Sequence, residues 1–422
     1  MKTFSELSLS SAIHHNLGRN GFVEPTPVQA QAIPPALAGE DVVATAQTGT
    51  GKTLAFVLPI LQTLSTKPAS KAIQALILSP TRELAIQIQE VFATISTGMG
   101  VRPVLVVGGL SERPQLDALR KGAQVVIATP GRLEDFVRRG LVKLNTASIL
   151  VLDEADRMLD MGFLPAIERI VAELPKQRQN MFFSATIEKS VAHLINKYTN
   201  NPARVTIGNV TKASEQVELN HYEIEHDRKL DMLVHMLGRE QGSFLVFART
   251  KHGVDKLAKR LSKAGLKACC MHGDRSQNQR NQALEGFRKG YYRVLVATDV
   301  AARGIHVDDV AHVINYDLPQ VAEDFIHRVG RTGRAGRKGI AWTFSSRSER
   351  GDIRKIESAL KTKLTRVEVP ADLPKQPKET AADALYKPEV VRSAKVQPID
   401  RAKKFGNKNR GWRGGRAAAV GY

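Results

Sequence analysis

The stretch Ala46-Gln47-Thr48-Gly49-Thr50-Gly51-Lys52-Thr53 decides how this chain is interpreted. An apolar, β-branched run over Asp41–Thr45 precedes it, and an apolar run over Leu54–Leu61 follows it. This order predicts a buried strand, a glycine loop and a helix that begins at Lys52. A phosphate-binding loop requires that context, because glycines let the backbone N–H groups turn toward phosphate oxygens.

Each part of this loop has an expected task at a nucleotide. Lys52 would place a positive charge at the β- and γ-phosphates, and the Thr53 hydroxyl would ligate Mg²⁺. Ala46 stands where the pattern usually has its first glycine. A chance glycine turn is the alternative, but it does not explain the flanking strand and helix. The predicted nucleotide-binding set is Ala46, Gln47, Thr48, Gly49, Thr50, Gly51, Lys52 and Thr53.

A second motif, which is acidic, follows the apolar run that ends at Leu152. Asp153 and Glu154 stand at the carboxyl end of this predicted strand, where open α/β sheets bind ligands. Asp153 can hold magnesium directly or through water, and Glu154 can orient and deprotonate the water that attacks the γ-phosphate. An acidic helix start is the alternative. The loop at 46–53 favours the catalytic interpretation.

Composition narrows the class of protein. The chain has 422 residues, which suggests two or three domains, and a net charge of +20, which favours a polyanionic partner. It has no run of 18 apolar residues and no apolar signal core after Met1, so we expect no membrane span and no secretion. Its two cysteines, Cys269 and Cys270, are adjacent, which fits a reducing cytoplasm better than a disulfide or a metal site.

Short apolar runs alternate with helical stretches in two regions, which predicts an α/β fold of two parallel sheets flanked by helices. The runs of the first region are Val42–Thr45, Ala75–Ser79, Val104–Val107, Val125–Ala128, Ser148–Leu152 and Asn180–Ser184. Those of the second region are Phe244–Phe247, Ala268–Met271, Val294–Ala297, Val310–Asn315 and Gly339–Phe344. We place domain one at 1–203, a linker at 204–217 and domain two at 218–369.

The remaining segment, 370–422, is predicted to be a disordered basic tail. Residues 371–422 carry 12 Lys or Arg and 5 Asp or Glu, a net charge of +7, and apolar periodicity is lost. Near its end the tail carries Arg410-Gly411-Trp412-Arg413-Gly414-Gly415-Arg416. Such arginines can neutralise phosphates and the tryptophan can stack on a base. A merely solubilising tail is the alternative.

Asp153-Glu154-Ala155-Asp156 is the sequence that names the DEAD-box RNA helicases, and this chain resembles that family over residues 4–346. Further blocks match in the family's order: Gly21–Gln29 with Phe4 ahead of it, Pro80–Ala85, Gly108-Gly109, Thr129–Arg132, Ser184-Ala185-Thr186, Val246–Thr250, Gln277–Arg280, Ala297–Gly304 and His327–Arg334. Within the family, 213–217 and 249–253 look most like the bacterial RhlE-type branch. The resemblance implies two RecA-like domains and ATP-dependent unwinding of short RNA duplexes or remodelling of RNA–protein complexes.

The resemblance also implies roles on the nucleotide side. Gln29 would read the adenine edge with its amide, and Phe22 would stack on the ring, although core packing is the alternative for a phenylalanine. Arg331 and Arg334 resemble arginine fingers, which reach the γ-phosphate only when the domains close. Two further implied positions are Ser184 and Thr186, a relay between nucleotide state and RNA, for which a satisfied strand-end turn is the alternative. The last is Asp299, a nucleotide-binding residue.

On the RNA side, the family's phosphate contacts map onto small residues and arginines. Such groups grip the backbone without reading bases, so binding would be largely independent of sequence, and 2′-hydroxyls would select RNA. For the lone hydroxyl residues, a helix cap is the alternative. The candidates are Pro80, Thr81, Arg82, Gly108, Gly109, Thr129 and Arg132 in domain one, and Thr250, Gly273 and Thr298 in domain two.

One position departs from the family pattern: His306 stands where Asp normally contacts the ATP ribose. An ATP-gated RNA clamp without strand separation is the alternative function, and a DNA translocase is a third. We expect ATP and Mg²⁺ as ligands, RNA as partner, a cytoplasmic location, and ribosomal or RNA-decay proteins as possible further partners.

Overall fold

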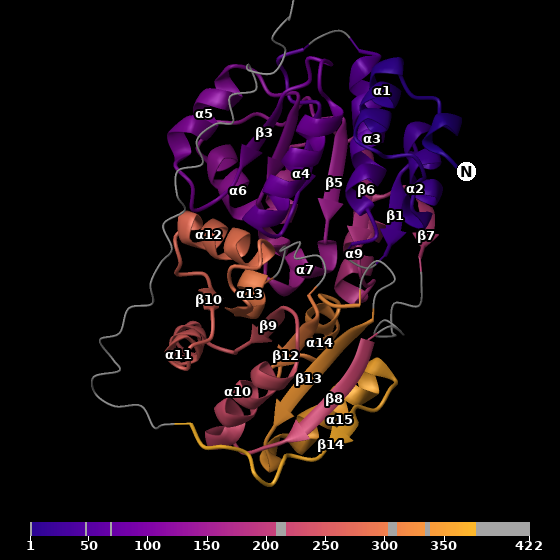
Figure 1. The fold of residues 1–422 in the computed structure, drawn as a ribbon. Helices are drawn as coiled ribbons and strands as arrows, with labels where there is room; N and C mark the ends of the chain where they lie inside the picture. The colour runs from indigo at the N-terminus through magenta and orange to yellow at the C-terminus, as the bar shows by residue number, and fades with distance from the viewer. Residues whose placement is uncertain are drawn as a thin grey trace, which may run out of the picture. The chain divides into compact units, whose positions relative to one another are not determined.

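The computed structural model describes residues 2–46, 49–67, 70–207, 217–302, 310–333 and 338–376. It contains two sheets of seven strands each (Figure 1). All pairs of neighbouring strands in both sheets are parallel. The predicted α/β class with two helix-flanked parallel sheets is therefore confirmed.

The first sheet has the strand order β3-β4-β2-β5-β6-β1-β7. Its central strands are short and buried along their whole length, as expected for a parallel sheet that helices cover on both faces. The strands are β1 Val42–Thr45, β2 Ala75–Leu78, β3 Pro103–Val106, β4 Val125–Ala128, β5 Ile149–Asp153, β6 Gln179–Ser184 and β7 Ala203–Thr206.

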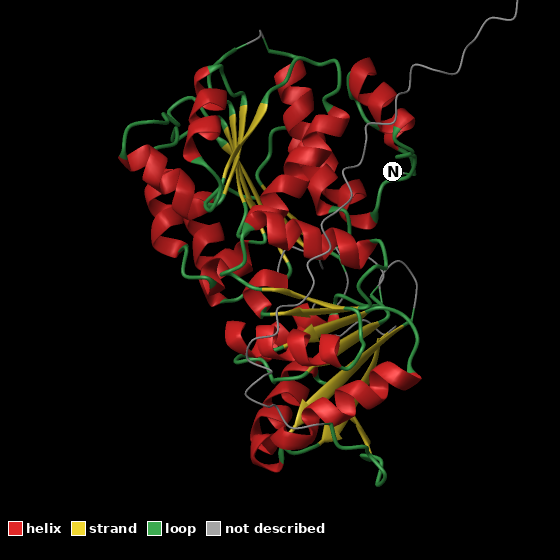
Figure 2. Ribbon diagram, turned by 60° about the vertical axis from the view of Figure 1, so that its left-hand side comes forward, coloured by secondary structure: helices red, strands yellow, loops and turns green. Residues whose placement is uncertain are grey.

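Two sets of helices cover this sheet, and Figure 2 shows strands enclosed by helices. One face packs against α1 Ser11–Arg19, α2 Pro27–Leu37, α3 Lys52–Ser65 and α4 Arg82–Ile95. The other packs against α5 Glu112–Arg120, α6 Pro130–Arg138, α7 Ala155–Asp160, α8 Leu164–Ala172 and α9 Lys189–Tyr198. Because both faces are apolar, polar side chains gather at the strand ends.

The second sheet has the order β10-β11-β9-β12-β13-β8-β14. Its strands are β8 Val217–Glu223, β9 Phe244–Phe247, β10 Ala268–Met271, β11 Val294–Ala297, β12 His312–Asn315, β13 Gly339–Ser345 and β14 Thr365–Val367. One face packs against α10 Lys229–Arg239 and α11 Lys251–Lys263. The other packs against α12 Gln277–Arg288, α13 Asp299–Ala302, α14 Ala322–Val329 and α15 Arg350–Leu360.

The predicted linker and tail need correction at their ends. Residues 204–206 belong to β7, which pairs with β1, and Val217 begins β8. Residues 208–216 lie outside the described part. At the tail, Leu373 is buried, its carbonyl accepts a hydrogen bond from Arg228 Nη2 (2.7 Å), and the Gln376 N–H donates to Asp231 Oδ1 (2.8 Å). Packing against α10 therefore extends the second domain to residue 376, beyond the loss of apolar periodicity at 370.

The structure also bears on the expectations from composition. Among the described residues, no helix is long and apolar enough to cross a membrane. Cys269 and Cys270 are free cysteines. The predicted disordered tail falls on residues 377–422, which the structure does not describe.

Candidate active site and nucleic-acid interface

The carboxyl edge of the first sheet divides the predicted site residues into two groups. Lys52 follows β1, Asp153 ends β5 and Ser184 ends β6, and these three strands are neighbours in the order β5-β6-β1. The RNA candidates follow β3, β4 and β2, which are also neighbours. One half of the edge thus collects the predicted ATP residues, and the other half collects the predicted RNA residues.

The loop before α3 has the geometry of a phosphate cradle. Gly49 and Gly51 adopt φ values of 87° and 85°, a backbone region that favours glycine. A Cβ on Gly51 would lie 2.5 Å from Gln29 Nε2, so this position also needs glycine for space. Lys52 is buried, and its Nζ donates to Ala46 O at 2.6 Å. Gln47 and Thr48 lie outside the described residues.

Gln29 connects α2 to this loop. Its Nε2 donates to Gly51 O (2.9 Å), and its Oε1 accepts from the Thr26 N–H (2.9 Å). An amide has two N–H groups and two acceptor lone pairs, so one of each is left for an adenine edge. Phe22 is 37% exposed, so its ring is open for stacking rather than part of the core; Phe4 is the buried aromatic of this segment.

Asp153 is a buried carboxyl among charges of both signs. Burial raises its pKa to about 7, Lys52 opposes this rise, and Glu154 and Asp156 add to it. Its Oδ1 accepts the Glu154 N–H at 3.1 Å. A hard cation beside this group would offset the crowded negative charge. The donor set of Asp153 and the hydroxyl of Thr53 therefore fits a magnesium ion.

Glu154 is held in place by a buried ion pair. Its backbone adopts φ 51° and ψ 54°, a left-handed conformation that is strained for a residue with a Cβ. Oε2 lies 2.5 Å from Arg157 Nη1, and both side chains are almost fully buried. Burial alone would raise the pKa of Glu154, but Arg157, Lys52 and Arg331 lower it to about 2. The group is therefore ionised, and Oε1 is the oxygen left to orient a water.

Asp156 joins the two motifs that the sequence analysis treated separately. Its Oδ2 accepts the N–H groups of Ala185 and Thr186 and the Thr186 hydroxyl, at 3.0, 2.8 and 3.1 Å. Its own N–H donates to Ser184 Oγ at 3.2 Å, and Ser184 O accepts the Ala46 N–H at 3.0 Å. The relay residues thus contact both the turn after β5 and the phosphate loop. The motif contains Asp156, but nothing in the motif itself indicates that its carboxylate bonds to residues 185 and 186.

Residues of the second domain reach this site. Arg331 is buried, and its charge is one cause of the low pKa of Glu154. Arg157 and Arg331 line one cavity of about 10 Å³, which is room for about one water. Asp299 forms a bidentate ion pair with Arg328, whose Nε and Nη2 donate to Oδ1 and Oδ2 at 2.5 and 2.7 Å. Arg334 and His306 lie outside the described residues.

The RNA candidates of domain one gather at the ends of β2, β3 and β4. The guanidinium of Arg82 packs so closely on Gly109 that a Cβ there would lie 2.4 Å from Nη2. The Gly108 N–H donates to Thr129 Oγ1 (3.4 Å), and Arg132 Nη1 donates to Leu110 O (3.5 Å). Pro80 and Thr81 are buried, and the Thr81 hydroxyl caps α4 by accepting the Leu84 N–H. The hydroxyls of Thr81 and Thr250 thus both make the helix-cap contact that was the alternative for the lone hydroxyl residues.

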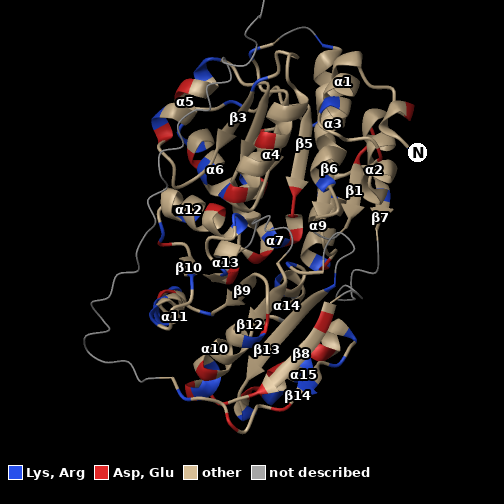
Figure 3. Ribbon diagram, viewed as in Figure 1, with Lys and Arg blue, Asp and Glu red and all other residues tan. Residues whose placement is uncertain are grey.

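In domain two, the three RNA candidates follow neighbouring strands. Gly273 follows β10, Thr298 follows β11 and Thr250 follows β9, and the strand order is β10-β11-β9. Thr250 and Gly273 are exposed, and Thr298 is buried. Lysine and arginine gather on the adjacent helix α11 (Figure 3). The second sheet thus repeats the arrangement of the first, with its predicted RNA residues at one half of its carboxyl edge.

Contacts between the two groups of predicted RNA residues could not be predicted from the sequence. Arg280 Nη1 lies 3.1 Å from Glu83 Oε1, with both side chains only 8% exposed, and Gln277 Oε1 accepts from Arg82 Nη1 at 2.6 Å. These pairs join the start of α4 to the start of α12. The blocks 80–85 and 277–280 had been recognised as family motifs, but nothing in the sequence paired them.

One other cluster resembles a metal site. Asp255, Cys270 and His272 place ligand atoms within 4.8 Å of one another. Asp255 Oδ1 is, however, already bound by Arg275 Nη2 at 2.5 Å and by His272 Nε2 at 2.9 Å. Burial raises the pKa of the Cys270 thiol to about 11. A thiol that stays protonated beside a guanidinium is a poor ligand for a cation, so we interpret this cluster as an ion-pair network.

The fold and these sites define a two-domain nucleic-acid-dependent ATPase, and the chain belongs to the DEAD-box helicase family. The model of the DEAD/DEAH box helicase family matches residues 26–194, and that of the helicase conserved C-terminal domain matches residues 228–336. DEAD-box ATP-dependent RNA helicase CshA of Geobacillus kaustophilus is 41% identical over 371 residues, which are 88% of this chain and 79% of CshA. The protein of the same name from Bacillus subtilis is 40% identical, over 87% of this chain and 74% of its own.

Solved structures agree with this assignment. S. cerevisiae Dbp5 bound to RNA and ADP BeF3 has a TM-score of 0.78 and 32% identity, and the match covers 87% of this chain and 96% of that one. Mss116p without its NTE and C-tail, bound to ssRNA and AMP-PNP, has a TM-score of 0.80 and 29% identity, with coverage of 87% and 79%. The family resemblance is confirmed. The RhlE-type placement stays a prediction, because these bacterial relatives carry the name CshA.

Proposed function

We propose that this chain is an RNA-stimulated ATPase that separates short RNA duplexes or remodels RNA–protein complexes as its two domains close. One observation carries the proposal: the nucleotide residues and the RNA candidates occupy the two halves of one sheet edge. Ser184 and Asp156 connect the phosphate loop to the catalytic turn between them. The CshA relatives are named ATP-dependent RNA helicases, and the Dbp5 and Mss116p structures hold RNA with a nucleotide.

For hydrolysis, each residue has a task that follows from its position. Lys52 binds the β- and γ-phosphates in place of the Ala46 carbonyl that it now contacts. Asp153 and Thr53 would hold magnesium, which neutralises charge on the phosphate oxygens when bound. Glu154 has one oxygen fixed by Arg157 and can orient the attacking water with the other. Because its pKa is about 2, Glu154 is a weak general base, and its main task is to position the water.

Arg331 completes the site from the second domain. Arginine fingers stabilise the charge of the transition state and are worth about 10³–10⁵ in rate. The effect of Arg331 on the pKa of Glu154 supports this role. We propose the same role for Arg334, and nucleotide contacts for Gln29, Phe22 and Asp299.

RNA would cross the β3-β4-β2 edge of one sheet and the β10-β11-β9 edge of the other. The candidates there are arginines, glycines and hydroxyl residues, which grip phosphate and sugar. We therefore expect little base specificity and a preference for ribose. We also propose a cytoplasmic location, which the free cysteines support, and protein partners among ribosomal or RNA-decay proteins.

The test compares ATP hydrolysis with no nucleic acid, with single-stranded RNA and with single-stranded DNA of the same length. We expect RNA to stimulate hydrolysis and DNA to have little effect. Equal stimulation by DNA would instead support a DNA translocase. No stimulation by either polymer would refute the proposal.

A further inference from the structure

A buried lysine in the second domain has no task in the chemistry above. Lys229 begins α10 and has no exposed surface. An ammonium group without water needs oxygens around it. Its Nζ donates to Tyr316 O at 3.1 Å and lies 3.6 Å from Glu349 Oε2 and 4.0 Å from Asp317 Oδ1. Burial lowers the pKa of Lys229, and the two carboxylates oppose this shift.

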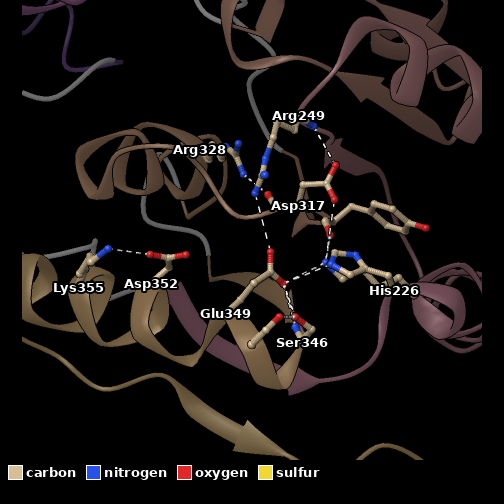
Figure 4. A network of polar contacts seen from close by, with 11 residues as sticks. His226, Arg249, Asp317, Arg328, Ser346, Glu349, Asp352 and Lys355 are labelled. Atoms are coloured by element: carbon tan, nitrogen blue, oxygen red, sulfur yellow. Dashed lines mark hydrogen bonds and ion pairs between the residues drawn. The ribbon is translucent and has the colours of Figure 1, made fainter.

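Both carboxylates also hold the turn that follows β9. Asp317 Oδ2 accepts the backbone N–H of Arg249 at 2.9 Å, and the Asp317 N–H donates to Phe247 O at 3.2 Å. Glu349 Oε1 lies 3.8 Å from Arg249 Nη2. In Figure 4, dashed lines join Arg249 to both Asp317 and Glu349. Arg249 is thus fixed by its backbone and by its side chain, through two residues whose charge Lys229 balances.

The turn that is held in this way presents Thr250. Thr250 is exposed and is the N-cap of α11, where its Oγ1 accepts the Gly253 N–H at 2.9 Å. Its backbone position follows directly from that of Arg249. Among the RNA candidates of domain two, Thr250 is therefore the one that the network around the buried Lys229 places.

The same network extends toward the nucleotide side. Arg328 Nη1 donates to Asp317 O at 2.6 Å, and its guanidinium also pairs with Asp299. Arg328 stands three residues before the finger Arg331. Asp317 therefore contacts the turn that carries Thr250 and also the arginine that holds Asp299.

We propose that Lys229 is a positioning residue for RNA binding, which fixes Asp317 and Glu349 and through them the Arg249–Thr250 turn. It contacts neither RNA nor ATP. The inference rests on the proposed function, because it requires that RNA binds at Thr250. Without the lysine charge, the two half-buried carboxylates would repel each other and shift, which would displace the Arg249–Thr250 turn, and the turn would bind phosphate less well.

The test uses the full chain with Lys229→Met, which keeps an unbranched apolar stem and removes the charge. We expect the RNA concentration that gives half-maximal ATPase stimulation to rise roughly tenfold, the worth of about one charge-assisted hydrogen bond. The kcat at saturating RNA should change by less than about twofold on the same argument. The matched control is Lys355→Met, which removes the same charge from an exposed pair with Asp352 in the same domain (Figure 4) and should leave half-saturation unchanged.

A purely structural role for Lys229 gives a different result. Partial unfolding lowers kcat, because fewer molecules are active, but leaves half-saturation by RNA unchanged, and that outcome would refute the inference. If Lys229→Met does not fold, Glu349→Gln is the second variant. It removes the carboxylate that contacts Lys229 and Arg249 at a less buried position, and we expect the same rise in the RNA concentration for half-maximal stimulation. If RNA does not stimulate the unsubstituted chain, the proposed function fails instead, so the two failures are distinguishable.

Discussion

Substituting Asp153 by Asn should make the nucleotide-free protein more stable, and the gain should grow with pH. The carboxyl has a pKa of about 7 in the folded chain, against an ordinary value of 3.8. At pH values between the two pKa values, Asp153 is protonated in the folded chain and ionised in the unfolded chain. Stability therefore falls as pH rises through this window, by about 1.4 kcal/mol per pH unit, and becomes flat above the folded pKa.

The size of the effect follows from the two pKa values. Between pH 5 and pH 8 the unsubstituted chain should lose roughly 2.5 kcal/mol through this one group. The amide side chain of the Asp153→Asn variant has no proton to lose, and its oxygen can still accept the Glu154 N–H that Asp153 Oδ1 accepts. The stability advantage of Asp153→Asn should thus increase by the same amount, which is about 5–10 °C in Tm for a domain of this size.

The assay is thermal unfolding of both proteins at pH 5, 6, 7 and 8, without nucleotide or magnesium. Each pair is compared at one pH, so the titration of all other groups cancels. The transition of the first domain is the one to follow, because Asp153 belongs to its sheet. A Tm difference that stays constant from pH 5 to pH 8 would refute the raised pKa, and with it the account of Asp153 as a crowded, cation-seeking carboxylate.

Three further changes test individual parts of the site. Lys52→Ala should weaken ATP binding by about tenfold or more, because it removes a charge-assisted contact with phosphate; unchanged affinity in a nucleotide titration would reject this role. Arg331→Ala should lower RNA-stimulated turnover by up to about 10³ without unfolding domain two, and a fragment of residues 1–207 that hydrolysed ATP at the full rate would contradict the finger. Truncation after Gln376, which keeps the contacts of Leu373 and Gln376 with the second domain, should leave turnover intact but weaken RNA binding at low salt, with a slope change of about 0.7 per lost phosphate contact. Parallel salt curves of equal affinity would leave the tail without a role in RNA binding.

Much of the fold could be predicted, because a buried parallel strand is recognisable as a short apolar run. The predictions for β1, β4, β9, β10 and β11 match the structure to the residue. The strands that were missed lack such a run. Ala203–Thr206 is an edge strand with only one buried residue, and Thr365–Val367 has only three residues. In Val217–Glu223, two consecutive polar residues, Asn220 and His221, are buried and interrupt the apolar pattern.

The site was predictable where one short segment carries the chemistry, as in the phosphate loop and the acidic turn after β5. The missed residues act as pairs from distant segments. Glu83 and Gln277 are 194 positions apart, and Lys229 meets Glu349 only because α10 and the start of α15 pack on the same domain. Sequence spacing cannot identify such partners, because the order of the strands in the sheet decides which distant segments lie side by side.

The central claim is that closure of the two domains on ATP and RNA separates the strands, and that hydrolysis at Glu154 reopens the domains for the next cycle. The most direct measurement is displacement of a short RNA duplex by the full chain with ATP, beside Glu154→Gln and beside a non-hydrolysable ATP analogue. We expect repeated displacement only by the unsubstituted protein with ATP, while Glu154→Gln still binds ATP and RNA. Glu154→Gln that turned over ATP and displaced strands at the same rate as the unsubstituted chain would contradict the account, and binding without displacement by any form would indicate an ATP-gated clamp instead.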